Sequence, residues 1–129
     1  MVTSRSVPRV SDRLSQIKYL FNLDMIADNN PEHYCEVSDE GLKDFALFEK
    51  INAEKAYFKA LDREKLAENS DHYPFAVRNV PCIFLMNEDG DAFKYYHTIH
   101  DTWKNSIFSN YEPTFNLIKD FIDSQPRTE

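Results

Sequence analysis

Apolar residues gather in three short runs along the chain, each about as long as a β-strand. The run 17–27 (IKYLFNLDMIA) is almost continuous and is followed by the polar turn DNNP. The runs 56–61 (AYFKAL) and 80–87 (VPCIFLMN) are similar, and the turn EDGD follows the last of them. Unbroken apolar runs of this length are typical of strands buried on both faces. We therefore predict three strands, with 17–27 buried on both sides.

Two longer segments show the spacing of amphipathic helices. The first spans 38–55, and Ser38 is placed to accept a backbone hydrogen bond as its N-cap. The second spans 112–124 and has Pro113 in its first turn, where proline is well tolerated. The predicted buried stripes consist of Leu42, Phe45, Phe48 and Ile51 in the first helix and of Phe115, Ile118, Phe121 and Ile122 in the second.

A shorter helix is predicted over 70–79, with Ser70 as its cap and Pro74 in its first turn. Strands thus alternate with helices, which favours an α/β fold with a partial mixed, mostly parallel sheet flanked by helices. The 129 residues fit a single domain. Within it, 1–11 is expected to be a loose lead-in and 126–129 a frayed tail.

Composition narrows the classes of partner. The formal net charge is −7 and no long basic run is present, so neither nucleic acid nor an anionic membrane is expected as a partner. No apolar run approaches the roughly 20 residues that cross a bilayer, and residues 1–16 lack the apolar stretch of a signal peptide. Cys35 and Cys82 form no CxxC pair, which excludes a thiolate zinc finger, while a disulfide and two free thiols both stay open.

Asp24 is an acidic residue inside the first apolar run. Burying a carboxylate is costly unless it is paired, hydrogen-bonded or bound to a metal. Ligands of open α/β sheets gather at the carboxyl ends of the strands, where Asp24 would lie. Ligand binding is therefore one interpretation of Asp24, and capping of the following turn together with Asp28 is the other.

The segment 94–103 (KYYHTIHDTW) holds two of the four histidines of the chain. A metal-bound imidazole usually donates its second N–H to a carboxylate, so His97 is a candidate ligand with Asp101 as its support. The alternative makes His97 a half-buried residue at the end of a strand and Asp101 a helix cap. His100 has less support, and His33 is expected in a surface loop.

Other catalytic motifs are absent from the sequence. No GxGxxG, P-loop, GxSxG or HExxH pattern occurs, and the two glycines, Gly41 and Gly90, provide no glycine-rich cradle for phosphate. Asp71 and His72 stand at the start of the short helix, where the helix dipole favours a negative charge, so capping alone explains Asp71.

Three segments nevertheless resemble one family when they are taken in order. NLDMIADNNP, SDHYPFAVRNVPCIFL and YYHTIHDT, followed by a terminal helix, are similar to the C-terminal half of the M28 zinc aminopeptidases, whose clan includes the glutaminyl cyclases. The resemblance runs from about Ile17 to Ile122. It implies part of an α/β/α sandwich, two zinc ions in the complete site, hydrolysis of N-terminal residues from peptides, and in many members export from the cell.

The resemblance also implies roles for four residues. Asp24 of NLDM would be a ligand of one zinc ion, and His97, which opens the pattern H-T-x-x-D-T, would be a ligand of the other. Asp101 would orient His97, and Asp71 would join the hydrogen bonds near the amino end of the substrate. The remaining ligands and the general-base glutamate of the family precede the NLDM strand, and this chain contains no Glu-Glu pair.

We therefore expect a segment of a larger M28-like catalytic domain with little or no activity alone. The first alternative is a non-catalytic binding or assembly module on the same half-fold, and the second is a fragment of a glutaminyl-cyclase-like enzyme. A partial sheet would expose a strand edge and apolar surface, which favours pairing with another chain. We therefore also predict self-association.

Overall fold

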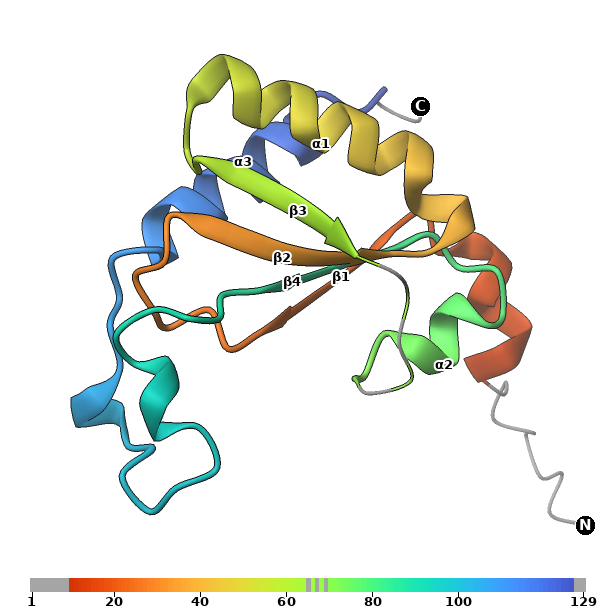
Figure 1. Cartoon of the computed structure of the whole chain (residues 1–129). Coiled ribbons are helices and arrows are strands. Elements are labelled where there is room, and N and C mark those ends of the chain that lie inside the picture. The colour runs from red at the N-terminus through yellow and green to blue at the C-terminus, as the bar shows by residue number, and fades with distance from the viewer. Residues whose placement is uncertain (1–9, 65, 67, 69, 127–129) are drawn as a thin grey trace, which may run out of the picture.

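The computed structural model describes residues 10–64, 66, 68 and 70–126, and within them four strands form one sheet (Figure 1). The strands are β1 (Leu20–Asp24), β2 (Glu32–Val37), β3 (Ala60–Glu64) and β4 (Cys82–Met86). The α-helices are α1 (Leu42–Lys55), α2 (Tyr73–Ala76) and α3 (Tyr111–Asp123). Short 3-10 helices are η1 (Val10–Gln16), η2 (Asp39–Gly41), η3 (Phe93–Tyr95) and η4 (Trp103–Asn105).

The sheet has the order β1-β4-β2-β3 and is mixed. β1 pairs with β4 in parallel, β2 pairs with β3 in parallel, and β2 and β4 are antiparallel. α1 and α3 lie on one face of the sheet, and α2 lies on the other (Figure 1). The predicted α/β class with a mostly parallel sheet is therefore confirmed.

The sequence analysis missed β2, and its placement of His33 in a surface loop is wrong. His33 lies within β2 and is fully buried. The side chains of β2 alternate between the two faces of the sheet, as in any strand. Those of His33, Cys35 and Val37 point toward α1 and α3. Polar residues on both faces hid this alternation.

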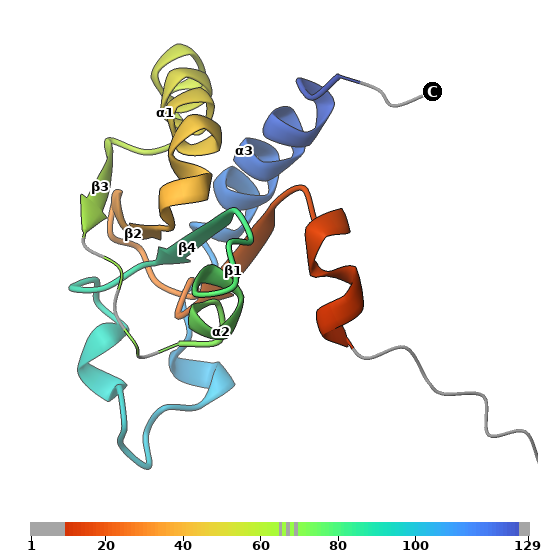
Figure 2. The same ribbon diagram turned by 90° about the vertical axis from the view of Figure 1, so that its right-hand side faces the viewer.

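The prediction that the first apolar run is buried on both faces is also wrong. β1 is an edge strand whose residues are half-buried or exposed, and Leu23 is 41% exposed. The central strand β4 is the one buried along almost its whole length. Figure 2 shows β1 at the margin of the sheet, with α3 above it.

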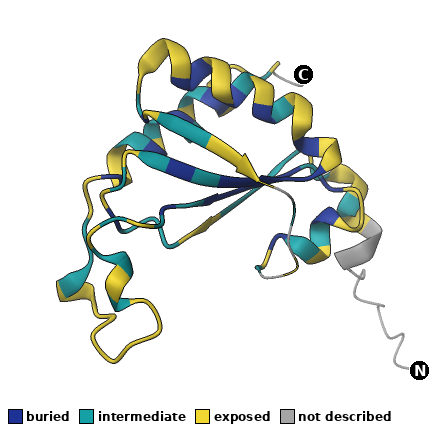
Figure 3. Cartoon of the chain, in the orientation of Figure 1, coloured by how far each residue is buried: buried dark blue, intermediate teal, exposed yellow. Residues whose placement is uncertain are grey.

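The main core lies between the sheet and the pair α1 and α3. Phe48 and Phe121 are fully buried there. The ring of Phe121 packs edge-on against that of Phe21, with centroids 5.3 Å apart, a favoured aromatic geometry. Figure 3 shows buried residues along the sheet side of α1 and exposed ones along its outer side.

Ser38 begins the first helical segment, as predicted. Its Oγ accepts hydrogen bonds from the backbone N–H of Gly41 at 3.2 Å and of Cys82 at 2.8 Å. The first turn is the 3-10 helix η2, and α1 ends at Lys55, followed by the C-cap residue Ala56, which has a left-handed φ of 54°. Residue 56 therefore belongs to the end of the helix, and the strand predicted from residue 56 begins only at Ala60, as β3.

Ser70 does not cap the short helix by its side chain. α2 begins after His72, which makes no side-chain capping bond. The backbone carbonyl of Ser70 instead accepts a hydrogen bond from Tyr73 N–H at 3.1 Å. Pro74 lies in the first turn, as predicted.

The predicted stripe of α1 is right at three of its four positions, since only Leu42 is exposed. The predicted stripe of α3 is right at Phe121, which is fully buried, and Ile118 is partly buried against the core, but Phe115 and Ile122 are exposed. The buried residues are Thr114, Leu117 and Phe121, whereas Phe115 is 57% exposed.

The apolar side of α3 that the core does not cover borders a groove next to β1. The groove has a volume of about 390 Å³. Its apolar lining residues are Leu23, Ile26, Tyr111, Phe115, Ile118 and Ile122. This groove is called the β1–α3 groove. Together with the open edge of β1 it leaves apolar surface exposed to solvent.

The ends of the chain fall only partly within the described residues. Of the predicted lead-in, residues 1–9 lie outside them, whereas Val10 already begins η1. Of the predicted tail, residues 127–129 lie outside them. Among the described helices, none is both long and apolar enough to cross a membrane.

Candidate functional site

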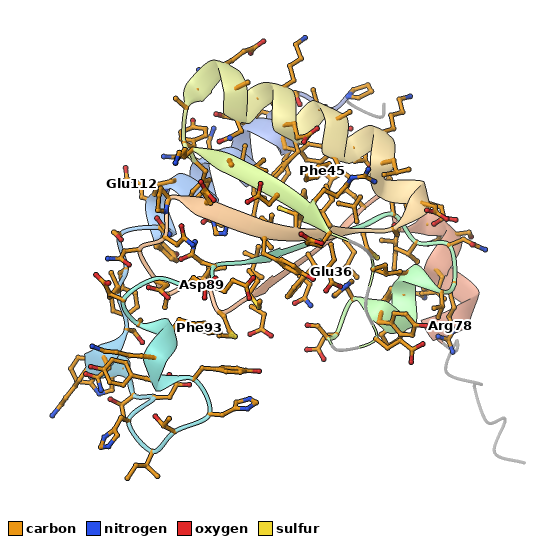
Figure 4. All side chains as sticks on the ribbon, viewed as in Figure 1. Glu36, Phe45, Arg78, Asp89, Phe93 and Glu112 are labelled. Carbon is orange, nitrogen blue, oxygen red and sulfur yellow. The ribbon has the colours of Figure 1, made fainter. Side chains whose placement is uncertain are left out.

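The sheet face opposite α1 and α3 carries two rows of side chains. Residues that face each other across neighbouring strands point to the same side of a sheet. The register therefore gives the rows Asn22–Phe84–Glu36 and Asp24–Met86–Tyr34. Figure 4 shows Glu36 on this face, with Phe45 on the opposite face beneath α1.

Apart from Asn22, the residues of these rows line an open cleft of about 680 Å³, called the cleft from here on. Asp24, His97 and Asp101 all line it. A smaller cavity of about 250 Å³ also includes Asp24 and Asp101 in its lining. Three of the four residues singled out in the sequence are thus brought to one place, although they come from β1 and from a distant loop.

Asp71, the fourth residue, is exposed and is not among the residues that line the cleft. Its neighbour His72 is fully buried and packs on Phe84 of the cleft floor, with ring centroids 4.7 Å apart. The role of Asp71 near a substrate therefore stays a prediction.

Buried polar contacts fix the loop of His97 to the end of β1. Asp28 is almost fully buried, and its Oδ1 accepts hydrogen bonds from Asn29 N–H at 2.8 Å and Ala92 N–H at 3.0 Å. Ile107 N–H donates to the carbonyl of Ala27 at 3.1 Å. The loop is thus held at both of its ends, which places His97 and Asp24 around one cleft.

Asn87, which follows β4, adds a second anchor. Its Oδ1 accepts from Asn30 N–H at 3.0 Å, and its Nδ2 donates to the carbonyls of Asn30 and Glu32 at 2.8 and 2.9 Å. Buried amides usually have all their hydrogen bonds satisfied, and Asn87 meets this expectation while joining two loops at the cleft end of the sheet.

His97 is an exposed loop residue with a left-handed φ of 57°. Its ring stacks on Tyr96 with centroids 3.7 Å apart. Met25, directly after Asp24, also has a positive φ of 56°. Non-glycine residues rarely adopt this conformation, and such residues concentrate at functional sites.

The alternative roles considered for His97 and Asp101 do not hold. His97 is neither half-buried nor at the end of a strand. The helical turn η4 has Thr102 as its N-cap residue, so Asp101 does not cap it. Asp28, by contrast, accepts a hydrogen bond from Asn29 N–H in the turn after β1, while a capping role of Asp24 in this turn stays a prediction.

The residues that line the cleft carry acidic and aromatic side chains. The acids are Asp24, Glu36, Glu88 and Asp101, and the aromatic residues are Tyr34, Phe84, Phe93 and Tyr96. No lysine or arginine occurs among these described lining residues. Burial, and then the charges of Asp89 and Glu64, raise the pKa of Glu88. The cleft therefore suits ligands with cationic or hydrogen-bond-donating groups.

A complete metal site is not formed by the described part of the chain. No group of three or more His, Cys, Asp and Glu side chains there could hold a metal ion. Catalytic zinc sites need about three protein ligands, so the residues present do not fit a closed zinc site. Asp24 and His97 offer one carboxylate and one imidazole at the same cleft.

The two cysteines are both buried free thiols. Burial is the main cause that raises the pKa of each thiol, to about 11 for Cys82. Of the two states left open by the sequence, the structure shows the reduced one. Neither thiol has the low pKa of a reactive cysteine.

The buried pair Glu36 and His72 beneath the cleft was missed by the sequence analysis. Nε2 of His72 lies 2.9 Å from Oε2 of Glu36. The signal was the alternation in EHYCEV, which puts Tyr34 and Glu36 on the same side as Asp24 once the segment is treated as a strand.

Comparison with known proteins agrees with this fold. The model of Peptidase family M28 matches residues 2–122, so the chain belongs to this family. M28 peptidases are generally zinc-dependent. No curated protein sequence matches the chain at a significant level.

Two solved structures share its fold. One is the LapA aminopeptidase of Legionella pneumophila, with a TM-score of 0.64 and 17% identity, covering 92% of this chain and 35% of that one. The other is the glutaminyl cyclase of Tannerella forsythia, with a TM-score of 0.59 and 19% identity, covering 84% of this chain and 40% of that one. The chain thus spans well under half the length of either protein.

Proposed function

We propose that the chain is the C-terminal segment of a zinc-dependent M28 aminopeptidase and has little or no activity alone. The observation that carries this proposal is that Asp24, His97 and Asp101 line one cleft, in a chain that matches the M28 model over residues 2–122. In the complete enzyme the reaction would be hydrolytic removal of the N-terminal residue of a peptide.

The chain would contribute part of the site. Asp24 would offer a carboxylate oxygen to one metal ion and His97 a ring nitrogen to the other. Asp101 would accept the second N–H of His97 and thereby hold the ring. When bound, zinc polarises a carbonyl and activates water. A general base would have to come from residues outside this set.

Zinc stoichiometry tests the proposal directly. The purified chain is first dialysed against metal-free buffer, its zinc binding is then measured by titration up to millimolar zinc, and His97→Ala is treated in the same way. Binding that is weak in the wild-type chain and lost in the variant supports His97 as a ligand. If both proteins take up no zinc at millimolar concentration, the half-site is refuted and the fold has been kept without its chemistry.

An alternative reaction is cyclisation of N-terminal glutamine. It is supported by the similarity to the Tannerella forsythia glutaminyl cyclase. A longer protein that contains this segment separates the two reactions, because cyclisation releases ammonia from glutaminyl peptides, whereas aminopeptidase action releases a free amino acid.

We also propose a second function, in which the segment is an assembly module that pairs with a second copy of itself. The β1–α3 groove favours it, because β1 is an open edge strand and apolar side chains of Leu23 and Phe115 are exposed beside it. An exposed strand edge that borders an apolar patch is a site for pairing with another chain. An identical partner would continue the sheet across β1.

A further inference from the structure

A chain of hydrogen bonds runs beneath the cleft from Tyr34 to Ser70. Tyr34 donates its hydroxyl hydrogen to Oε1 of Glu36 at 3.0 Å, and Nε2 of His72 lies 2.9 Å from Oε2 of the same carboxyl group. Nδ2 of Asn22 lies 3.2 Å from Nδ1 of His72 and donates to Oγ of Ser70 at 2.8 Å. Five side chains from three parts of the chain, β1, β2 and the segment before α2, thus form one network.

The direction of the hydrogen bonds follows from their donors. Because the amide of Asn22 donates to Nδ1 of His72, this nitrogen is an acceptor and the ring proton is on Nε2. Nε2–H then donates to Oε2 of Glu36, while the hydroxyl of Tyr34 donates to Oε1. His72 is also stacked on Phe84, with the ring planes 12° apart. The position of the Glu36 carboxyl group is therefore fixed from both ends.

Tyr34 is the member of the network that lies in the same row of the sheet as Asp24, whereas Ser70, which also lines the cleft, comes from outside the sheet. Tyr34 is half-buried and lines the cleft, whereas Glu36 and His72 are fully buried. A tyrosine hydroxyl has one hydrogen, and this one is given to Glu36. The oxygen of Tyr34 is left as an acceptor. Burial and the bond to Glu36 raise the pKa of Tyr34 to about 12, so the hydroxyl stays protonated at neutral pH.

We infer that Tyr34 is a ligand-positioning residue whose hydroxyl oxygen accepts a hydrogen bond from an N–H group of a bound peptide, either an amide or a terminal ammonium. Glu36 and His72 act through Tyr34, because they orient its hydroxyl. The inference rests on the proposed function, in which the cleft takes a peptide. It adds a contact separate from the metal ligands, two strands away from Asp24 across the sheet.

Binding of leucine amide to the full chain tests this inference. The amide carries both kinds of N–H donor, and its dissociation constant is measured by NMR titration in the presence of zinc. Tyr34→Phe keeps the ring and removes the acceptor. Tyr73→Phe is the matched control, because Tyr73 also donates to a glutamate, Glu68, at 3.0 Å, but lies outside the cleft lining.

Loss of one neutral hydrogen bond should weaken binding about fivefold in Tyr34→Phe, equivalent to ~1 kcal/mol. Tyr73→Phe should bind as the wild type does. Glu36→Gln should also weaken binding, but should have no further effect when Tyr34 is already phenylalanine, because it acts through that hydroxyl. A merely structural role would leave the effects of the two substitutions on binding additive or absent.

Two results would overturn the inference, and only the second would also contradict the proposed function. If Tyr34→Phe binds leucine amide as tightly as the wild type while His97→Ala binds it more weakly, the contact to Tyr34 is wrong and the proposed function stands. If the wild-type chain shows no binding with or without zinc, both the contact and the peptide-binding cleft are wrong.

Discussion

The imidazole of His72 and the carboxyl group of Glu36 form a buried pair, with Nε2 and Oε2 2.9 Å apart and neither side chain exposed to solvent. The pair joins Glu36 of β2 to His72, just before α2, and thereby holds this segment against the sheet face that carries the cleft. Removing one partner leaves a polar group of the other without its hydrogen bond in the interior, which is costly.

We predict that Glu36→Ala lowers the free energy of unfolding by about 2–3 kcal/mol, as expected for loss of a hydrogen bond to a charged group. Urea denaturation followed by circular dichroism measures it. Glu68→Ala is the control, since Glu68 bonds to Tyr73 at an exposed position and should cost less than about 0.5 kcal/mol. Equal effects of the two substitutions would contradict the stabilising role of the buried pair.

His33 should make folding stability depend on pH in the acidic range. Burial lowers the pKa of His33 in the folded chain, whereas the unfolded value is near 6.5. Below pH ~6.5 the unfolded chain therefore binds a proton that the folded chain does not bind. Stability must then fall on acidification, with a slope of at most ~1.4 kcal/mol per pH unit from this group.

The measurement is urea denaturation of the wild type and of His33→Gln between pH 5 and pH 8. Glutamine can still bond to Thr114, whose Oγ1 lies 3.3 Å from Nε2 of His33, but it does not titrate. The difference in stability between the two proteins should shrink as the pH falls. A constant difference across this range would show that His33 does not bind protons differently in the two states.

Gly90 should be intolerant of alanine for a reason unrelated to backbone conformation. No glycine among the described residues has a positive φ, but a Cβ at Gly90 would overlap the carboxyl group of Asp28. Asp28 is fixed by the N–H groups of Asn29 and Ala92 and cannot easily move away. We predict a loss of about 1–3 kcal/mol for Gly90→Ala.

A double-mutant cycle with Asp28→Ala tests the cause. Once the carboxylate is removed, Gly90→Ala should cost much less, because the space next to residue 90 is then open. If the cost of Gly90→Ala is the same in both backgrounds, overlap with Asp28 is not its origin. The cycle is measured by urea denaturation at neutral pH.

The convergence of Asp24 and His97 on one cleft could be predicted from the sequence because both residues belong to segments that can be recognised there. Asp24 closes an apolar strand, and His97 opens a motif that resembles one family. β2 could not be predicted, because Glu36 and His33 put polar groups on both of its faces. The pattern of apolar positions does not reveal such a strand, because its buried polar side chains find their hydrogen-bond partners far away in the sequence, at Thr114 and His72.

The buried side of α3 could be predicted only in part, at Phe121 and Ile118, for a different reason. The helix carries apolar residues on two sides, with Leu117 and Phe121 on one and Phe115 and Ile122 on the other. Periodicity shows that both sides are apolar, but it does not show which one the neighbouring elements cover. In this chain α1 and the sheet cover the side of Leu117, and the side of Phe115 faces the β1–α3 groove.

This uncovered side of α3 leads to the prediction of self-association. If a second copy covers the groove, light scattering after size-exclusion chromatography should show a mass that rises from monomer toward dimer as the protein concentration increases. Phe115→Ser should shift the equilibrium toward the monomer, because burying a phenylalanine side chain contributes roughly 1.5–3 kcal/mol. Circular dichroism checks that the variant remains folded.

Ile99→Ser is the matched control, since Ile99 is 90% exposed but lies in the loop that carries His97, outside the groove lining. It should associate as the wild type does. A compact monomer at every concentration would refute self-association. Dissociation by Ile99→Ser instead of Phe115→Ser would mean that the copies meet through the loop of the cleft, leaving the edge of β1 open.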